Sequence, residues 1–362
     1  MTRQTSLNTT HREMGARMVP FGGWDMPLHY GSQIEEHHAV RRDAGMFDVS
    51  HMSVVDLMGR GARDYLRHLL ANDVDKLRSL GRALYSCMLK ENAGVIDDLI
   101  VYRLGDAFYR LVVNAATTEK DLAWLRQQSS GFELEILHRA DLDMIAIQGP
   151  NARTKTLPLL PADCAAAAGL APFNAVLGKD WVVARTGYTG EDGFEVMLPK
   201  EKTVAFWHAL HDAGVQPCGL GSRDTLRLEA GMNLYGSDMD EQTSPLEAGL
   251  GWTLAWEPAD RDFIGRSALE AQKARGELQS FVGLLLEGKG VLRNHQKLFQ
   301  GDREIGEITS GGFSPTLQLS IALARIAPDV EGAIQVEMRG KFLPVRRVKP
   351  NFVRHGQSLI ES

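Results

Sequence analysis

The feature that most constrains the fold is a change of pattern near Phe281. From there the chain consists of short apolar stretches separated by Gly, Asp and Pro. Several short strands with turn residues between them are typical of a small sandwich or barrel. The pattern therefore predicts an all-β, barrel-like domain over residues 278–362. Its expected strands are 282–286, 304–310, 321–326, 334–338 and 343–348.

The rest of the chain mixes helices with antiparallel strands. Turn residues between neighbouring apolar runs favour a meander, in which successive strands pair with one another. Apolar spacing predicts helices at 32–44, 61–70, 120–128 and 204–212, and a charged helix at 268–277 marks the boundary to the barrel. The fold class expected is α+β. The expected strands are 52–58, 85–89, 99–104, 108–113 and 144–148, with a hairpin from 181–184 and 193–198.

Charge and hydropathy exclude two classes of function. The chain of 362 residues has a formal net charge of -6, whereas a nucleic-acid-binding domain normally carries a basic patch or stripe. The first residues lack the apolar core of a signal peptide. No apolar run approaches the ~20 residues that span a bilayer. We therefore expect a cytoplasmic protein that binds neither nucleic acid nor membrane.

Metal and disulfide chemistry are not indicated. The three cysteines, Cys87, Cys164 and Cys218, are far apart and form no C-x-x-C pair. Small buried thiols in a reducing compartment are the expected outcome. No H-E-x-x-H pattern and no Cys/His cluster occurs, so no metal site is predicted.

Two glycine-rich segments carry the candidate recognition residues. In 185–195 a glycine-punctuated turn opens into a strand that carries Glu195. In 219–231 a loop leads into a short helix, on which Arg223 and Arg227 share a face because they are four residues apart. An acid that accepts N–H groups and an arginine that donates to a carbonyl together suit a flat, amide-like heterocycle.

Each segment also has a simpler reading. The glycines of 185–195 lack the Lys-Ser/Thr and the strand-to-helix context of a phosphate loop, and Gly219-Leu-Gly221 lacks the third glycine of a dinucleotide fingerprint. The arginines could instead serve internal salt bridges, for example from Arg223 to Asp240 or Glu247.

A pair of acids, Asp97 and Asp98, stands at the entry to a buried strand. Alternation sends their side chains to opposite faces, so one points toward the interior or a cleft and needs a partner, for which a ligand amine is one candidate. The alternative is a turn residue that caps the strand start. Trp252 and Trp256 are four residues apart; core packing is the usual fate of such a pair, but one could stack on a ring.

Together these segments resemble the glycine cleavage T-protein family of aminomethyltransferases, and the resemblance extends from about residue 15 to 353. That family implies a multi-lobed folate-binding fold with a central hole. The folate-binding region implied by the resemblance is 1–270 and has two α+β lobes. One lobe combines about 1–50 with 140–270, and the other is 51–139. Further family-like motifs are 21–28, 43–51, 186–195, 231–240 and 308–316.

The resemblance also assigns site residues. Asp98 matches the family's key aspartate and is the expected catalytic residue, while Glu195 and Arg223 match the pair that anchors the pterin ring. One small departure is Ala93, where relatives often have glycine, which concerns the turn and not the acids. The remaining positions that match folate-binding residues are Asp97, Met52, Leu84, Tyr85, Val112, Asn114, Tyr188 and Trp252.

The reaction implied by the family moves one carbon from the lipoyl arm of H-protein to tetrahydrofolate. It yields 5,10-methylenetetrahydrofolate, ammonia and dihydrolipoyl H-protein, without a metal. Lipoylated H-protein is the expected partner, with a functional link to P-protein and L-protein.

Two related classes are alternatives. One is the folate-binding part of a dimethylglycine- or sarcosine-oxidising enzyme, but such chains usually add a flavin domain and no flavin fingerprint is present. The other is a non-catalytic, folate-binding protein of iron–sulfur assembly. That group has a Lys-Gly-Cys signature, where this chain has Arg185-Thr-Gly-Tyr-Thr-Gly190.

Overall fold

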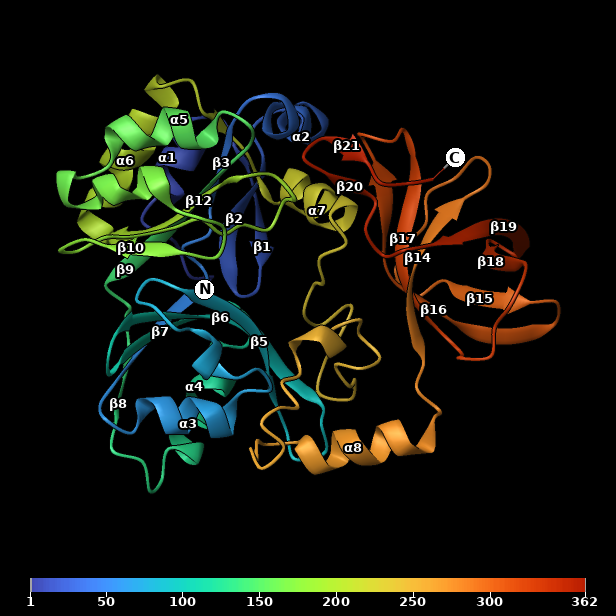
Figure 1. Cartoon of the computed structure of the whole chain (residues 1–362). Coiled ribbons are helices and arrows are strands. Elements are labelled where there is room, and N and C mark those ends of the chain that lie inside the picture. The colour runs from blue at the N-terminus through green and yellow to red at the C-terminus, as the bar shows by residue number, and fades with distance from the viewer. Residues whose placement is uncertain (1, 362) are drawn as a thin grey trace.

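Two sheet-containing lobes and a barrel make up the computed structural model, which describes residues 2–361 (Figure 1). The first lobe is built on a six-stranded sheet in which all neighbours pair antiparallel except β13 with β3. Its strands, in spatial order, are β10 (Ala175–Leu177), β11 (Val182–Ala184), β12 (Gly193–Pro199), β9 (Leu142–Gln148), β3 (Gly45–Asp48) and β13 (Gln216–Pro217).

The second lobe is built on a five-stranded antiparallel sheet, in which a three-stranded meander is extended by two strands that are not neighbours in sequence. It lies within the stretch of chain between β3 and β9, which are themselves paired, so the whole lobe is an insertion between two neighbouring strands of the first sheet. Its strands, in spatial order, are β5 (Ala83–Leu89), β6 (Val95–Gly105), β7 (Phe108–Val113), β4 (Ser53–Met58) and β8 (Glu135–His138).

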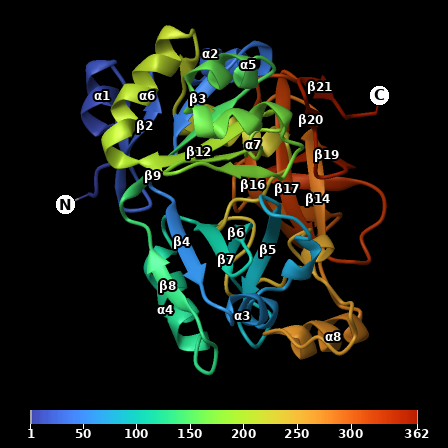
Figure 2. The ribbon, with the colours of Figure 1, turned by 60° about the vertical axis from the view of Figure 1, so that its left-hand side comes forward.

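The two sheets face each other, and their helices lie on the outer sides (Figures 1 and 2). Alternation along β9 shows this: Met144 and Ala146 pack with Tyr102 and Val112 of the second sheet, whereas Ile145 packs under the helices. The outer helices of the first lobe are α1 (Asn8–Glu13), α2 (Gln33–Arg42), α5 (Ala152–Thr156) and α6 (Lys200–Asp212); those of the second are α3 (Ala62–Leu69) and α4 (Thr118–Gln128).

Helix α7 (Leu220–Glu229) connects the first lobe to the barrel. It packs against α2 and the edge hairpin β1 (Arg17–Phe21) and β2 (Trp24–His29) on one side, and against barrel strands on the other. Glu229 at its end is buried and accepts hydrogen bonds from Arg41 of α2 and from Ser314 and Thr316 of the barrel. These contacts fix the orientation of the face of α7 that carries the candidate arginines.

The C-terminal domain is a closed six-stranded barrel, in the order β14-β17-β16-β15-β18-β19. The predicted α+β class and the predicted barrel are confirmed. The sequence reading missed β15, without which the barrel could not close. The barrel strands are β14 (Ser280–Leu286), β15 (Lys297–Gln300), β16 (Arg303–Ser314), β17 (Leu319–Ile326), β18 (Ile334–Met338) and β19 (Lys341–Val348), followed by the small hairpin β20 (Val353–Arg354) and β21 (Gln357–Ser358).

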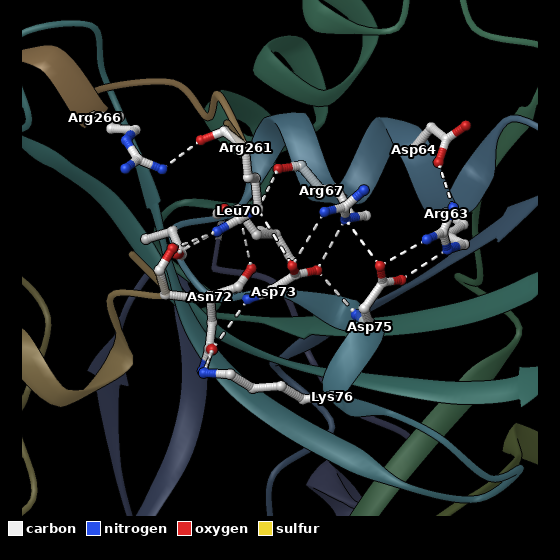
Figure 3. A network of polar contacts seen from close by, with 12 residues as sticks. Arg63, Asp64, Arg67, Leu70, Asn72, Asp73, Asp75, Lys76, Arg261 and Arg266 are labelled. Carbon is white, nitrogen blue, oxygen red and sulfur yellow. Dashed lines mark hydrogen bonds and ion pairs between the residues drawn. The ribbon is translucent and has the colours of Figure 1, made fainter. Parts of the chain in front are cut away.

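An irregular segment, 231–265, runs from α7 along the second lobe to α8 (Arg266–Arg275). Arg261 anchors it: this buried guanidinium donates to the backbone carbonyls of Leu70, Ala71, Asn72 and Ala255 (Figure 3). Carbonyl oxygens thus accept most of its N–H groups, and the Asp73 carboxylate lies 3.8 Å from its Nε. The segment carries Trp252, whose position therefore depends on this network. The short 3-10 turns are η1 (Val74–Lys76), η2 (Leu157–Leu159), η3 (Ala162–Gly169) and η4 (Gly251–Thr253).

We propose that the two sheets and the barrel mark the structural units: about 1–50 with 140–270, 51–139, and 278–362. Cys87, Cys164 and Cys218 are buried and free, as expected. Within residues 2–361 no helix is both long and apolar enough to cross a membrane.

Candidate active site

The Asp98 carboxyl lies at the inter-lobe face of the second sheet. It is half-buried on β6, where Tyr85 of β5 donates to Oδ2 at 2.8 Å and the Asn114 amide donates to Oδ1 at 3.0 Å. Burial raises the pKa of Asp98 to about 7, and the charge of Asp97 acts in the same direction. A carboxyl that changes its protonation state near neutrality is suited to proton transfer.

Asp97 is turned the other way and is fully buried. It accepts the backbone N–H of Asn114 at 3.0 Å and the Asn114 side-chain amide at 2.8 Å. Burial raises the pKa of Asp97 as well. The opposite orientation of the two acids follows the alternation expected from the sequence, and Asn114 connects them because its amide touches both carboxyls.

Trp252 covers the Tyr85 ring. The two rings are stacked, with centroids 5.6 Å apart and planes inclined by 18°. Trp252 is 66% exposed, so core packing is wrong for this residue. Trp256 does pack against a buried cluster of the irregular segment. An exposed indole over a tyrosine that holds Asp98 offers an aromatic surface next to the candidate catalytic acid.

Glu195 and Arg223 form a second polar group. Glu195 on β12 is buried and accepts the Thr186 hydroxyl at 2.6 Å through Oε2. Arg223 on α7 lies over the Tyr188 ring at 4.8 Å from the centroid and over Phe47 at 5.9 Å. Its buried Nη1 has no hydrogen-bond partner among residues 2–361. Burial lowers the pKa of Arg223, and the charge of Glu195 partly offsets this.

Arg227 has a different role from Arg223, although both lie on α7. Its guanidinium is paired with Asp224 at 2.8 Å and Asp238 at 3.1 Å, and it donates to Ser310 of the barrel at 3.0 Å. The salt-bridge alternative is therefore confirmed for Arg227. It is wrong for Arg223, which pairs with neither Asp240 nor Glu247 and forms no ion pair within residues 2–361.

Tyr188 links the two polar groups. Its ring carries Arg223, and its hydroxyl donates to the backbone carbonyl of Asn233. Burial raises the pKa of Tyr188, and the charges of Asp98 and Arg223 both act on the same hydroxyl. Asp98, Tyr188, Arg223 and Glu195 therefore belong to one locus, assembled from β6, from β12 and the turn before it, and from α7.

The apolar candidates divide between the two faces of the second sheet. Met52 and Val112 pack with Ile100 in the cluster between the sheets, on the side of Asp98. Leu84 packs instead against the cluster under α3, because alternation turns it away from its neighbour Tyr85. The structure thus brings Met52 and Val112 toward the locus and does not bring Leu84 there.

Sequence reasoning missed three contributors. Thr186 lies within the 186–195 motif, and its hydroxyl, two residues before Tyr188, is a signal that could have indicated a partner for Glu195. Phe47 beneath Arg223 gave no signal beyond an apolar strand. Asp121 on α4 is buried beside Asp97; an acid near a helix start suggests only a favourable dipole contact.

Within residues 2–361 no three or more His, Cys, Asp or Glu side chains gather to hold a metal ion. Two surface hollows, of about 120 Å³ beside Arg63 and Arg103 and about 500 Å³ beside Arg139 and Lys179, are lined by other residues than those of the locus.

Comparisons with known proteins agree with the fold. The GCVT N-terminal domain matches residues 7–258, and the glycine cleavage T-protein C-terminal barrel domain matches residues 279–354. The structure resembles that of a glycine cleavage system aminomethyltransferase T from Bartonella henselae, with a TM-score of 0.90 and 34% identity over 96% of this chain and 97% of that chain.

Curated relatives are similar over their full length. An aminomethyltransferase of Pseudomonas syringae pv. tomato is 57% identical over 99% of this chain and 100% of that protein. One of Xanthomonas axonopodis pv. citri is 58% identical over 99% of this chain and 98% of that protein. The fold, with its two sheet-containing lobes and C-terminal barrel, is thus that of a one-carbon transferase. The chain belongs to the glycine cleavage T-protein family, and its enzyme class is aminomethyltransferase.

Proposed function

We propose that the protein transfers the methylene carbon from the aminomethyl-dihydrolipoyl group of H-protein to tetrahydrofolate. The carbon loses its bonds to sulfur and to the amine nitrogen and gains bonds to two folate nitrogens. The two protons released from those nitrogens go to the thiolate and to ammonia, so no oxidant or reductant is needed. The observation that carries the proposal is that one locus holds both Asp98, whose pKa lies near neutrality, and Arg223, whose Nη1 has no partner among residues 2–361.

The free groups of the locus fit a folate. Arg223 Nη1 needs an acceptor, which the pterin carbonyl provides. Glu195, held through Oε2 by Thr186, can accept ring N–H groups at its other oxygen. Tetrahydrofolate, when bound, supplies the nucleophilic nitrogens. The exposed Trp252 offers a stacking surface for the rest of the co-substrate.

In this proposal Asp98 is the group that stabilises charge and accepts a proton during the transfer. Tyr85 and Asn114 fix both oxygens of its carboxyl, which orients it before substrate arrives. In the ionised form it stabilises positive charge that develops on the attacking amine, and it accepts a proton from that nitrogen. A pKa near the working pH makes both protonation states accessible.

We further propose that lipoylated H-protein is the donor and that the protein acts in the cytoplasm beside P-protein and L-protein. Family membership supports these proposals. Asp98, Asp97, Glu195, Arg223, Tyr188, Met52, Tyr85, Val112, Asn114 and Trp252 remain our candidates for catalysis and folate contact, and Leu84 is the one whose observed packing offers it no support.

The test is an assay of purified protein with aminomethylated H-protein, with and without tetrahydrofolate, that follows ammonia and methylenetetrahydrofolate together. Folate-dependent release of both supports the proposal, and folate binding without turnover contradicts it. Asp143→Asn is a matched control for Asp98→Asn, because Asp143 is a buried carboxyl on β9 whose pKa is also raised by burial. Only the Asp98 variant should lose turnover.

A further inference from the structure

A third acidic side chain lies behind the Asp97–Asp98 pair and has no part in the mechanism so far. Asp121 is near the start of α4 and is fully buried. Neither of its carboxyl oxygens has a hydrogen-bond donor among residues 2–361. Its carboxyl is within hydrogen-bond reach of the Asp97 carboxyl. Two carboxyls in contact cannot both be ionised at low cost, so one of them must carry a proton.

The charged groups around Asp121 do not neutralise it. Asp97 approaches it from β6, Lys120 belongs to its own helix, and the uncharged Thr117 is the N-cap of that helix. The Lys120 ammonium is directed to the Tyr235 hydroxyl at 2.8 Å and to Glu241 at 2.9 Å, both from the irregular segment. No lysine or arginine within residues 2–361 forms an ion pair with Asp97, Asp98 or Asp121.

The hydrogen bonds show which carboxyl holds the proton. Asp97 accepts two N–H groups of Asn114, and such bonds favour its ionised form. Neither Asp121 oxygen has such a donor. Thr117 and Lys120 favour its charged form, but burial and Asp97 oppose it more strongly. A protonated Asp121 can donate its O–H to Asp97. The side-chain amide of Asn114 has two hydrogens, and the geometry directs them to Asp97 and to Asp98.

We propose that Asp121 is a positioning residue for the transfer reaction: it remains a neutral acid, donates to Asp97, and thereby fixes Asn114 and the catalytic carboxyl of Asp98. The inference rests on the proposed role of Asp98. The chain of contacts runs from α4 through β6 to the locus, so a buried proton on one element sets the orientation of a group on another.

The protonation states fit this order. Burial and the charge of Asp97 raise the pKa of Asp121 to about 9. The pKa of Asp98 is about 7. Asp121 therefore keeps its proton over the range in which Asp98 gives up its own. If Asp121 ionised first, Asp97 would lose its donor and the Asn114 amide would lose its fixed partner.

The direct test is infrared spectroscopy of the full-length protein in heavy water, which detects the C=O stretch of protonated carboxyls. We expect a component that disappears as the pH rises through about 9 in the wild type. Asp121→Asn should lack it and Asp143→Asn should retain it. An Asp121→Asn spectrum with that component intact would overturn the proposal. This readout needs no turnover, so it stays valid even if the proposed function fails.

The second test compares two substitutions in the transfer assay. Asp121→Leu removes the donor, and we expect kcat to fall by about 10- to 100-fold with a displaced pH profile. Asp121→Asn restores an N–H donor of similar shape and should recover kcat to within about threefold of wild type. Equal loss in both variants, or full turnover in Asp121→Leu, would refute the positioning role. If Asp121→Leu does not fold, the spectra of Asp121→Asn still decide.

Discussion

Replacing Arg223 by methionine separates recognition from stability. Methionine keeps much of the length and apolar packing of the arginine stem but has no N–H donor. Arg227→Met, one helical turn further along α7, is the matched control. The two positions differ in one respect that the structure defines: Arg227 is paired with Asp224 and Asp238, whereas Nη1 of Arg223 has no partner.

The two variants should differ in how much they lower the free energy of unfolding. Removing the unpartnered donor of Arg223 should recover about 1–3 kcal/mol of desolvation cost. Loss of its buried contact with the Tyr188 ring should cost about 2 kcal/mol, and loss of the longer contact with Phe47 about 0.5–1 kcal/mol. The net loss in the free energy of unfolding should therefore be at most about 2 kcal/mol. Arg227→Met leaves the buried Asp238 uncompensated and should cost about 3–5 kcal/mol.

Folate affinity should show the opposite pattern. A hydrogen bond from a charged donor contributes about 1.5–3 kcal/mol, so Arg223→Met should weaken tetrahydrofolate binding by about 10- to 150-fold. The assay pairs urea unfolding with titration calorimetry on both variants. An Arg223→Met protein that binds folate like wild type, or that is destabilised as much as Arg227→Met, would refute the reading of Arg223 as an anchor.

Three further predictions concern the acid, the anchor of the irregular segment and the helix-to-barrel contact. Asp98→Asn should lower kcat by about 10²- to 10⁴-fold with little change in folate affinity. Wild-type turnover should rise as the pH passes through about 7, because Asp98 loses its proton there. The pH–rate profile of the variant should lack this rise. A raised KM with unchanged kcat would contradict that role. Arg261→Met should lower the free energy of unfolding by about 3–5 kcal/mol, because several backbone carbonyls lose their donor. It should also separate Trp252 from the Tyr85 ring, which tryptophan fluorescence would report. The control is Arg303→Met, which breaks an exposed ion pair with Asp329 and should change stability little. Burial raises the pKa of Glu229, but hydrogen bonds and charge from His37 and Arg41 outweigh it and hold the pKa at about 2. The ionised carboxylate therefore stabilises the fold above the ordinary glutamate range, and this stabilisation is lost as the pH falls toward 2. Glu229→Gln should be less stable than wild type at pH 7, and acid unfolding curves should show the difference disappearing at low pH.

The sequence predicted best where the local pattern and the tertiary structure agree. The hairpin around the glycine turn and the helix at Ser32 have strong local signals, and Ser32 does cap α2 by accepting the Glu35 N–H. Strand β15 is only four residues long, from Lys297 to Gln300, with one fully buried apolar side chain, Leu298. Its pairing with β16 and β18 depends on distant residues that no local pattern displays.

The locus was predictable by residue type but not by partner. Spacing alone could place Arg223 and Arg227 on one face, yet only the fold shows that Asp238 neutralises the second and leaves the first free. Asp121 is the opposite case. Its position in the first turns of a helix suggests an exposed acid, and its burial against Asp97 arises from how α4 docks on the second sheet.

The insertion of the second lobe between β3 and β9 determines the order in which the chain can mature on the ribosome. All strands of the five-stranded sheet have emerged once His138 leaves the exit tunnel. The six-stranded sheet begins earlier, at Gly45, but cannot be completed before β13 is synthesised. The lobe that starts second is thus able to finish first, and β3 must remain unpaired during that interval. Nascent chains stalled once residue 140 has left the exit tunnel should therefore already protect the Asp97–Asp98 strand while the segment around Phe47 stays open to protease.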